Sequence, residues 1–168
     1  MMLFNKEDMA EMIVAGPRPT FNKEMFKELA ILTANSLNVK KDDEDYSDCI
    51  EAIEKVLQRN KFCSDGYEFG KEFEDAGFEI DSQVVSDLDC ISHDRYYILS
   101  KAVEKWVITD NIQPVYKIGD KVIIKISFRE IEGEIVNINT KQAYYSVKTA
   151  DYVGNGGYVI NYEDIKIK

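Results

Sequence analysis

The sequence predicts an α+β protein, with an N-terminal all-α domain over residues 1–112 and a five-stranded small β-barrel over residues 113–168. Apolar residues recur at helical spacing as far as about residue 109, and short runs of Val, Ile and Tyr separated by glycine-containing turns follow. Pro114 stands between the two patterns. Proline ends helices and favours extended backbone in the residue before it, so it is expected to close the helical region.

Composition bounds the class of protein. A chain of 168 residues with 45% hydrophobic residues can bury a core without covalent cross-links. Cys49, Cys63 and Cys90 are odd in number and widely spaced, which argues against a disulfide framework or a structural zinc site. The N-terminus lacks the pattern of an export signal, and no run of about 18 apolar residues occurs. We therefore expect a cytoplasmic protein with no membrane contact and no cofactor.

Charge is unevenly distributed along the chain. Residues 115–168 hold 8 Lys and Arg against 7 Asp and Glu, which leaves 13 against 24 of the chain's 21 and 31 in residues 1–114. The helical part therefore carries all of the excess negative charge. Such a surface repels nucleic acid and speeds the encounter with basic partners, although acidic surfaces also serve solubility alone.

A repeated tetrad marks the first two expected helices. Phe-Asn-Lys-Glu occurs at residues 4–7 and again at residues 21–24, and in each copy asparagine is expected to cap a helix. The phenylalanine before each cap and the apolar residue four places after it, Met9 or Phe26, have the spacing of a hydrophobic staple. We interpret the repeat as helix-capping chemistry.

The helices are expected in the following order. The first ends at Gly16, where glycine and the following proline favour a stop. Asp65 and Glu68 have the spacing of a capping box, and Asp81 is expected to cap a short helix. The acids of the charged connection 40–45 are expected to cap the helix that follows.

Further helices are expected over about residues 23–36, 46–59, 66–76, a short stretch after Asp81, and 93–109. The inner face of the second is expected to hold Phe26, Leu29, Ala30 and Thr33; that of the last, Leu99, Ala102, Val103, Trp106 and Val107.

The C-terminal third has the pattern of short strands. Asn155, Gly156 and Gly157 form an expected turn, and Ser127 to Glu132 an expected loop. Five short strands in about 50 residues satisfy their edges best by closing into a barrel. The expected strands are 122–126, 133–138, 143–149, 157–160 and 165–167.

Three segments of this region carry a resemblance. Gly119 to Val122 matches the opening turn, Gly133 to Val136 the second strand, and Asn161 with Tyr162 the closing helical turn of Src-homology-3-like small barrels, including the Tudor and KOW types. The region therefore resembles those barrels. Ile160 stands where the polyproline-binding members carry proline, and the expected loop 127–132 is not basic, unlike the loops of nucleic-acid-binding members.

A second resemblance concerns residues 65–89, which include Asp65-Gly66-Tyr67-Glu68-Phe69-Gly70 and Gly77-Phe78-Glu79-Ile80-Asp81. This stretch is similar to a helical segment of uncharacterised bacteriophage accessory proteins. The resemblance implies a phage or mobile-element origin and, with it, a role as an inhibitor of host defence. It implies no particular target.

The sequence does not predict an enzyme. The one histidine, His93, follows Cys90 by three residues, but no glycine turn that could form an oxyanion site stands nearby, and cysteine is commonly a buried, inert residue. Residues 154–157 lack the lysine, serine and helix of a phosphate-binding loop. No metal site matches a recurring ligand spacing.

The sequence therefore predicts a non-enzymatic binding protein, of the kind that a phage uses as an anti-CRISPR or anti-restriction inhibitor of a nucleic-acid-handling host protein with a basic surface. The residues expected to bind that partner are acidic: Asp42, Asp43, Glu44, Asp45, Glu72, Glu74 and Asp75. One alternative is an adaptor that binds RNA or DNA through the barrel surface, with Tyr144, Lys148, Tyr152 and Tyr158. A phage structural component that self-assembles, or a homodimer, are further alternatives.

Overall fold

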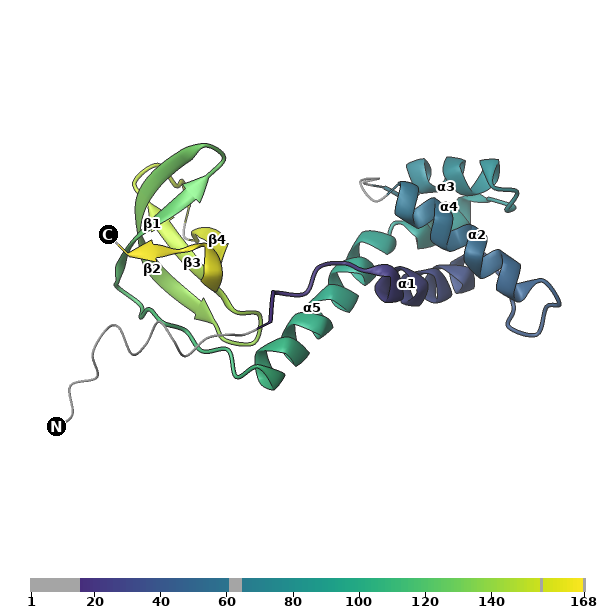
Figure 1. Ribbon diagram of the computed structural model, residues 1–168. Helices are drawn as coiled ribbons and strands as arrows, with labels where there is room; N and C mark the ends of the chain where they lie inside the picture. The colour runs from purple at the N-terminus through teal and green to yellow at the C-terminus, as the bar shows by residue number, and fades with distance from the viewer. Residues whose placement is uncertain (1–15, 61–64, 155, 168) are drawn as a thin grey trace. The chain divides into compact units, whose positions relative to one another are not determined.

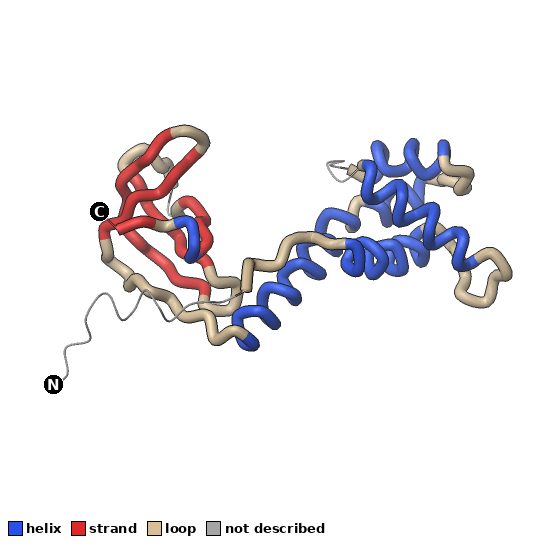
Figure 2. The backbone as a smooth tube through the Cα atoms, in the orientation of Figure 1, coloured by secondary structure: helices blue, strands red, loops and turns tan. Residues whose placement is uncertain are grey.

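The computed structural model describes residues 16–60, 65–154 and 156–167 (Figures 1 and 2). Helices come first along the chain and an antiparallel sheet follows, so the predicted α+β class is confirmed. The contacts of the chain divide it into two compact units, a helical unit of residues 19–101 and a sheet unit that combines residues 16–18 with 102–167. The predicted domain boundary at residue 112 stays a prediction. The helix expected to end at Gly16 lies outside the described residues.

The helices of the chain are α1 Lys23–Ser36, α2 Tyr46–Arg59, α3 Gly66–Asp75, α4 Ser82–Leu88 and α5 Ile91–Thr109. The first two have the expected bounds, and α5 begins two residues before the expected start. Residues up to Lys101 of α5 belong to the helical unit, and the remainder belong to the sheet unit. No helix in the described part of the chain is both long and apolar enough to cross a membrane.

Most of the predicted helix caps are confirmed. The side chains of Asn22, Asp65 and Asp81 each accept a hydrogen bond from a backbone N–H in the first turn of α1, α3 and α4. The rings of Phe21 and Phe26 lie 4.8 Å apart, as a hydrophobic staple requires. The cap of α2 differs from expectation. Asp45 occupies the N-cap position without a capping bond from its side chain, because its backbone is not extended there.

The helical unit is built around apolar side chains contributed by every one of its helices. Its buried residues include Leu29, Ala30, Ile53, Val56, Leu57, Phe69, Phe73, Val84, Leu88 and Ile98. Thr33 is also buried, and its hydroxyl donates to the carbonyl of Leu29 (2.9 Å). Phe26 was expected on the inner face of α1 but is only half-buried, because its ring packs against Phe21 and the guanidinium of Arg95. On α5, Val103 is buried, whereas the other expected inner residues are half-buried.

The sheet has the strand order β4-β3-β2-β1-β5, and all its pairings are antiparallel. Its strands are β1 Lys121–Ile126, β2 Arg129–Asn139, β3 Tyr144–Thr149, β4 Tyr158–Asn161 and β5 Lys166–Ile167. A single 3-10 turn, Tyr162–Asp164, joins β4 to β5. The expected closed barrel of five short strands is wrong: four strands form a curled half-barrel, and β5 only adds two residues beside β1 (Figure 1).

Two local features shape the half-barrel. The register between β2 and β3 shifts at Val136, and such a bulge bends a strand and increases its twist. The loop expected over 127–132 is instead a tight turn at Ser127 and Phe128, since residues 129–132 continue as strand β2. The buried core of the sheet comprises Val122, Ile124, Ile135, Tyr145, Val147 and Ile165.

Candidate partner-binding site

The helical unit carries an open groove of about 500 Å³ where three connections meet. One wall follows the end of α1, a second is the first turns of α2, and the third is the connection from α3 to α4. The lining residues are Leu37, Asn38, Val39, Asp48, Cys49, Ala52, Ala76, Gly77, Phe78 and Glu79. The lining is about equally polar and apolar, and it includes two carboxylates, Asp48 and Glu79.

The predicted acidic residues lie next to these walls in the chain. Asp42 to Asp45 fill the connection between Val39 and α2, and all four are exposed. Glu74 and Asp75 end α3 immediately before Ala76, and both are exposed. Residues 40–48 contain five acids and two lysines, so the segment is net negative. The fold thus places six of the seven predicted residues on segments that lead into one groove.

Two of these carboxylates make hydrogen bonds or ion pairs within the helical unit. Asp43 accepts a hydrogen bond from the backbone N–H of Lys40 (2.9 Å), which holds the turn before α2. Glu72 accepts from the side chain of Asn60 (2.8 Å) and pairs with Arg59 at 3.7 Å, so it ties the end of α2 to α3. The acids most open to a partner are therefore Asp42, Glu44, Glu74 and Asp75.

The pKa of the Cys49 thiol reflects the negative charges near the groove. Partial burial raises the pKa of its thiol above the ordinary value, and the charges of Asp45, Asp43 and Asp48 raise it further, as does a hydrogen bond to Asp45. Three carboxylates acting on one thiol indicate that a cation, rather than an anion, is favoured at this position. The same effect makes Cys49 a poor nucleophile.

The residues predicted for the barrel surface do not form one exposed platform. The rings of Tyr152 and Tyr158 pack edge to face at 5.1 Å, and both side chains are half-buried, as is Tyr144. Lys148 is exposed, but it pairs in register with Glu134 and lines a shallow hollow that also contains Glu132. Half-buried rings offer little surface for base stacking, and the carboxylates beside Lys148 oppose contact with phosphates.

No group of three or more His, Cys, Asp or Glu side chains within the described ranges could hold a metal ion. Cys90 and His93 are both exposed, at the start of α5.

The contacts of Arg18 within the sheet unit were not predicted from the sequence. Arg18 pairs with Glu163 (2.6 Å), donates to the carbonyls of Gln142 and Ala143 (3.1 and 2.5 Å), and lies over the ring of Trp106 at 5.2 Å. Long-range contacts of this kind leave no local pattern. Their effect is to tie residues 16–18 to the sheet.

Tyr162 lies in the same region, 4.3 Å from the ring of Tyr145. Burial raises its pKa from 10.0 to about 12, and Tyr145 adds to the shift while Arg18 opposes it. The folded chain therefore holds this proton more tightly than the unfolded chain. The stability that results is complete below pH 10 and is lost as the pH rises from 10 to about 12.

We expect the thermal midpoint of the sheet unit to fall more steeply between pH 10 and 12 in the wild-type chain than in a Tyr162→Phe variant. The single tryptophan, Trp106, belongs to this unit, so its fluorescence can follow the melt. The two proteins share every other ionisable group, so the difference between their profiles reports Tyr162 and its contact with Tyr145. Parallel pH profiles would contradict the assignment.

Comparison of the chain with protein-family models, with curated proteins and with solved structures finds no match.

Proposed function

We propose that this chain is a non-enzymatic binding protein that docks a basic segment of a partner protein in the acidic groove of its helical unit. The proposal rests on one observation: the groove contains Asp48 and Glu79, and exposed acids at 42–45 and 74–75 stand next to its lining segments in the chain. Charge complementarity of this kind sets the association rate and the choice of partner.

The lining of the groove suggests what the basic segment contains. Val39 and Phe78 are half-buried apolar residues of the lining, and Asp48 and Glu79 belong to the same lining. A segment with one apolar side chain between lysines or arginines fits both features. The apolar anchor supplies buried area, and the flanking cations supply specificity.

In its sharper form the proposal makes the partner a nucleic-acid-handling defence protein of a bacterial host, and this chain a phage-type inhibitor acting in the host cytoplasm. The support is chemical: a protein that grips phosphates exposes Lys and Arg, and an acidic surface competes for them. The resemblance of residues 65–89 to phage accessory proteins is consistent with this role.

We further propose that the half-barrel is a Src-homology-3-like module. Its strand order β4-β3-β2-β1-β5 and the 3-10 turn before β5 support the proposal. The opening turn supports it too, since Gly119 has a φ of +92° and the N–H of Lys117 is held by the side chain of Asp120.

The test is retention of proteins from a nuclease-treated bacterial lysate on the immobilised full chain. We expect a basic protein to be retained, to leave with added salt, and to be lost when Asp42 and Glu44 are both changed to lysine. The proposal would be overturned if the protein stayed bound when salt is added and when Asp42 and Glu44 are changed to lysine. It would also be overturned by a shift of labelled oligonucleotide that Tyr144→Ala with Lys148→Ala abolishes, because the barrel would then be the binding module.

A further inference from the structure

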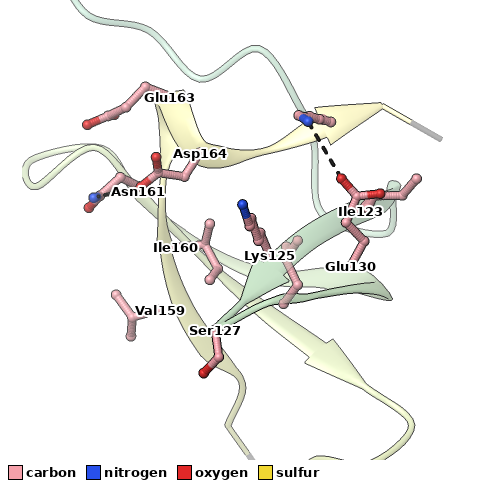
Figure 3. A pocket seen from close by; sticks show the side chains of 11 residues that line it. Ile123, Lys125, Ser127, Glu130, Val159, Ile160, Asn161, Glu163 and Asp164 are labelled. Carbon is pink, nitrogen blue, oxygen red and sulfur yellow. Dashed lines mark hydrogen bonds and ion pairs between the residues drawn. The ribbon is translucent and has the colours of Figure 1, made fainter.

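The half-barrel has an open seam beside β4. One edge of β4 pairs with β3, and no strand among the described residues pairs with its other edge. A groove of about 480 Å³ occupies this seam, which is within the size range of ligand sites (Figure 3). Its lining comes from β1, the start of β2, β4, the 3-10 turn and β5, and includes Ile123, Lys125, Val159, Ile160, Asp164 and Lys166.

The backbone of β4 is free on the side of the seam. The N–H of Tyr162 bonds the carbonyl of Ala143 at 3.0 Å, which sets the alternation of the ladder. Two residues earlier, Ile160 therefore bonds β3 with its N–H and C=O, opposite Tyr145. The N–H and C=O of Val159 then point away from β3 and into the seam. Val159 is also 63% exposed, a high value for a strand valine.

Side chains around the seam alternate in character. Ile124 is buried and Ile160 packs on the core, whereas Lys125 and Val159, one position along each strand, are exposed. A strand lying between β4 and β1 would therefore meet apolar side chains on its inner face and Lys125 on its outer face. Figure 3 shows the Lys125 side chain between the ribbons of β1 and β4.

Among the charged residues of the lining, Lys125 has no ion pair in the described part of the chain, although Glu130 lies opposite it in the β1–β2 register. Lys166 pairs with Glu130 at 3.6 Å, and Glu163 pairs with Arg18. Asp164 accepts from the side chain of Asn161 (3.1 Å). The ammonium of Lys125 is therefore left to attract a carboxylate from whatever occupies the seam.

We propose that the seam binds an extended segment of a partner protein, which adds to the sheet as a strand beside β4. The segment alternates apolar residues, facing Ile160, with an acidic residue placed next to Lys125. Backbone hydrogen bonds to Val159 supply affinity, and the alternating side chains supply specificity. This site is independent of the acidic groove, and its partner has the opposite charge.

The test uses a fluorescein-labelled, end-blocked peptide, Thr-Val-Glu-Val-Glu-Val-Thr, titrated with the full chain and followed by anisotropy. Val159→Pro removes the N–H that faces the seam but no donor to β3, and proline is tolerated on edge strands. We expect it to weaken binding at least tenfold. Val159→Thr keeps the N–H and is the matched control, expected to bind like the wild type.

Charge is tested separately with the lysine version of the peptide, Thr-Val-Lys-Val-Lys-Val-Thr. Lys125→Glu is expected to reverse the preference between the two peptides, whereas Lys141→Glu, on the β2–β3 turn, is expected to leave it unchanged. The comparison of the two peptides remains interpretable even if Val159→Pro disturbs the fold, because it uses only Lys125→Glu and Lys141→Glu. Equal binding of both peptides by the wild type, or binding untouched by both Val159→Pro and Lys125→Glu, would overturn the proposal. So would self-association that Val159→Pro abolishes in the absence of peptide binding, since a second copy would then fill the seam.

Discussion

Changing Asp42 and Glu44 together to lysine is expected to slow association with the captured basic partner by about tenfold or more at low salt. Both side chains are exposed on the connection that leads into the groove, and neither is needed for the turn, which depends on Asp43. Electrostatic steering acts mainly on the association rate and is screened by salt. The rate of the variant should therefore change little between low and physiological salt. Stopped-flow or biosensor kinetics at several salt concentrations measure this.

Glu24→Lys with Glu28→Lys provides the matched control. It changes the net charge by the same amount, and both residues are exposed on α1, more than two turns before the groove residue Leu37. An effect of net charge alone would slow the two double variants equally. Equal slowing of the two double variants would contradict a specific role of the groove, because the overall negative charge alone would then explain the association rate.

Gly66→Ala is expected to destabilise the helical unit by about 3 kcal/mol or more, at the upper end of overpacking costs. A Cβ at residue 66 would lie 2.0 Å from the carbonyl oxygen of Val85 and 2.8 Å from the backbone nitrogen of Asp89. These are backbone atoms, so relief requires α3 to move away from α4. The movement would also break the bond from the N–H of Gly66 to the side chain of Asp89 (2.6 Å).

Far-UV circular dichroism of the full chain in denaturant measures the loss, because the helices dominate that signal. Trp106 fluorescence follows the sheet unit in the same sample and is expected to keep its midpoint. Gly77→Ala is the control: its Cβ would meet nothing within 4 Å, and only the left-handed φ of +94° opposes it, at a cost of about 1 kcal/mol. Equal midpoints for the two variants would contradict the close packing of α3 on α4.

Helix positions could be predicted from the sequence because their causes are local. Asn22, Asp65 and Asp81 each cap a helix through atoms two or three residues away, so the pattern is readable in a short window. The strands were predicted nearly as well, because valine, isoleucine and tyrosine alternate with polar residues between glycine turns. The loop expected over 127–132 was too long, since nothing in the residue type of Ser127 signals the φ of +56° that makes a tight turn there.

The groove could not be predicted, because its walls are connections that meet only in the folded unit. Val39 and Phe78 are far apart in the sequence and carry no shared motif. The acidic residues were visible as charge, but that Glu72 is engaged by Asn60 depends on how α2 meets α3. The open seam was missed for the same reason: strand pattern alone does not report how many residues of β5 pair with β1.

Hydrogen exchange of the full chain, alone and bound to the captured basic partner, tests the central claim most directly. Binding in the acidic groove predicts slower exchange of backbone amides in residues 37–52 and 74–79, with the β4 peptide unchanged. Protection confined to the sheet unit, with the groove segments exchanging as in the free chain, would contradict the proposed function.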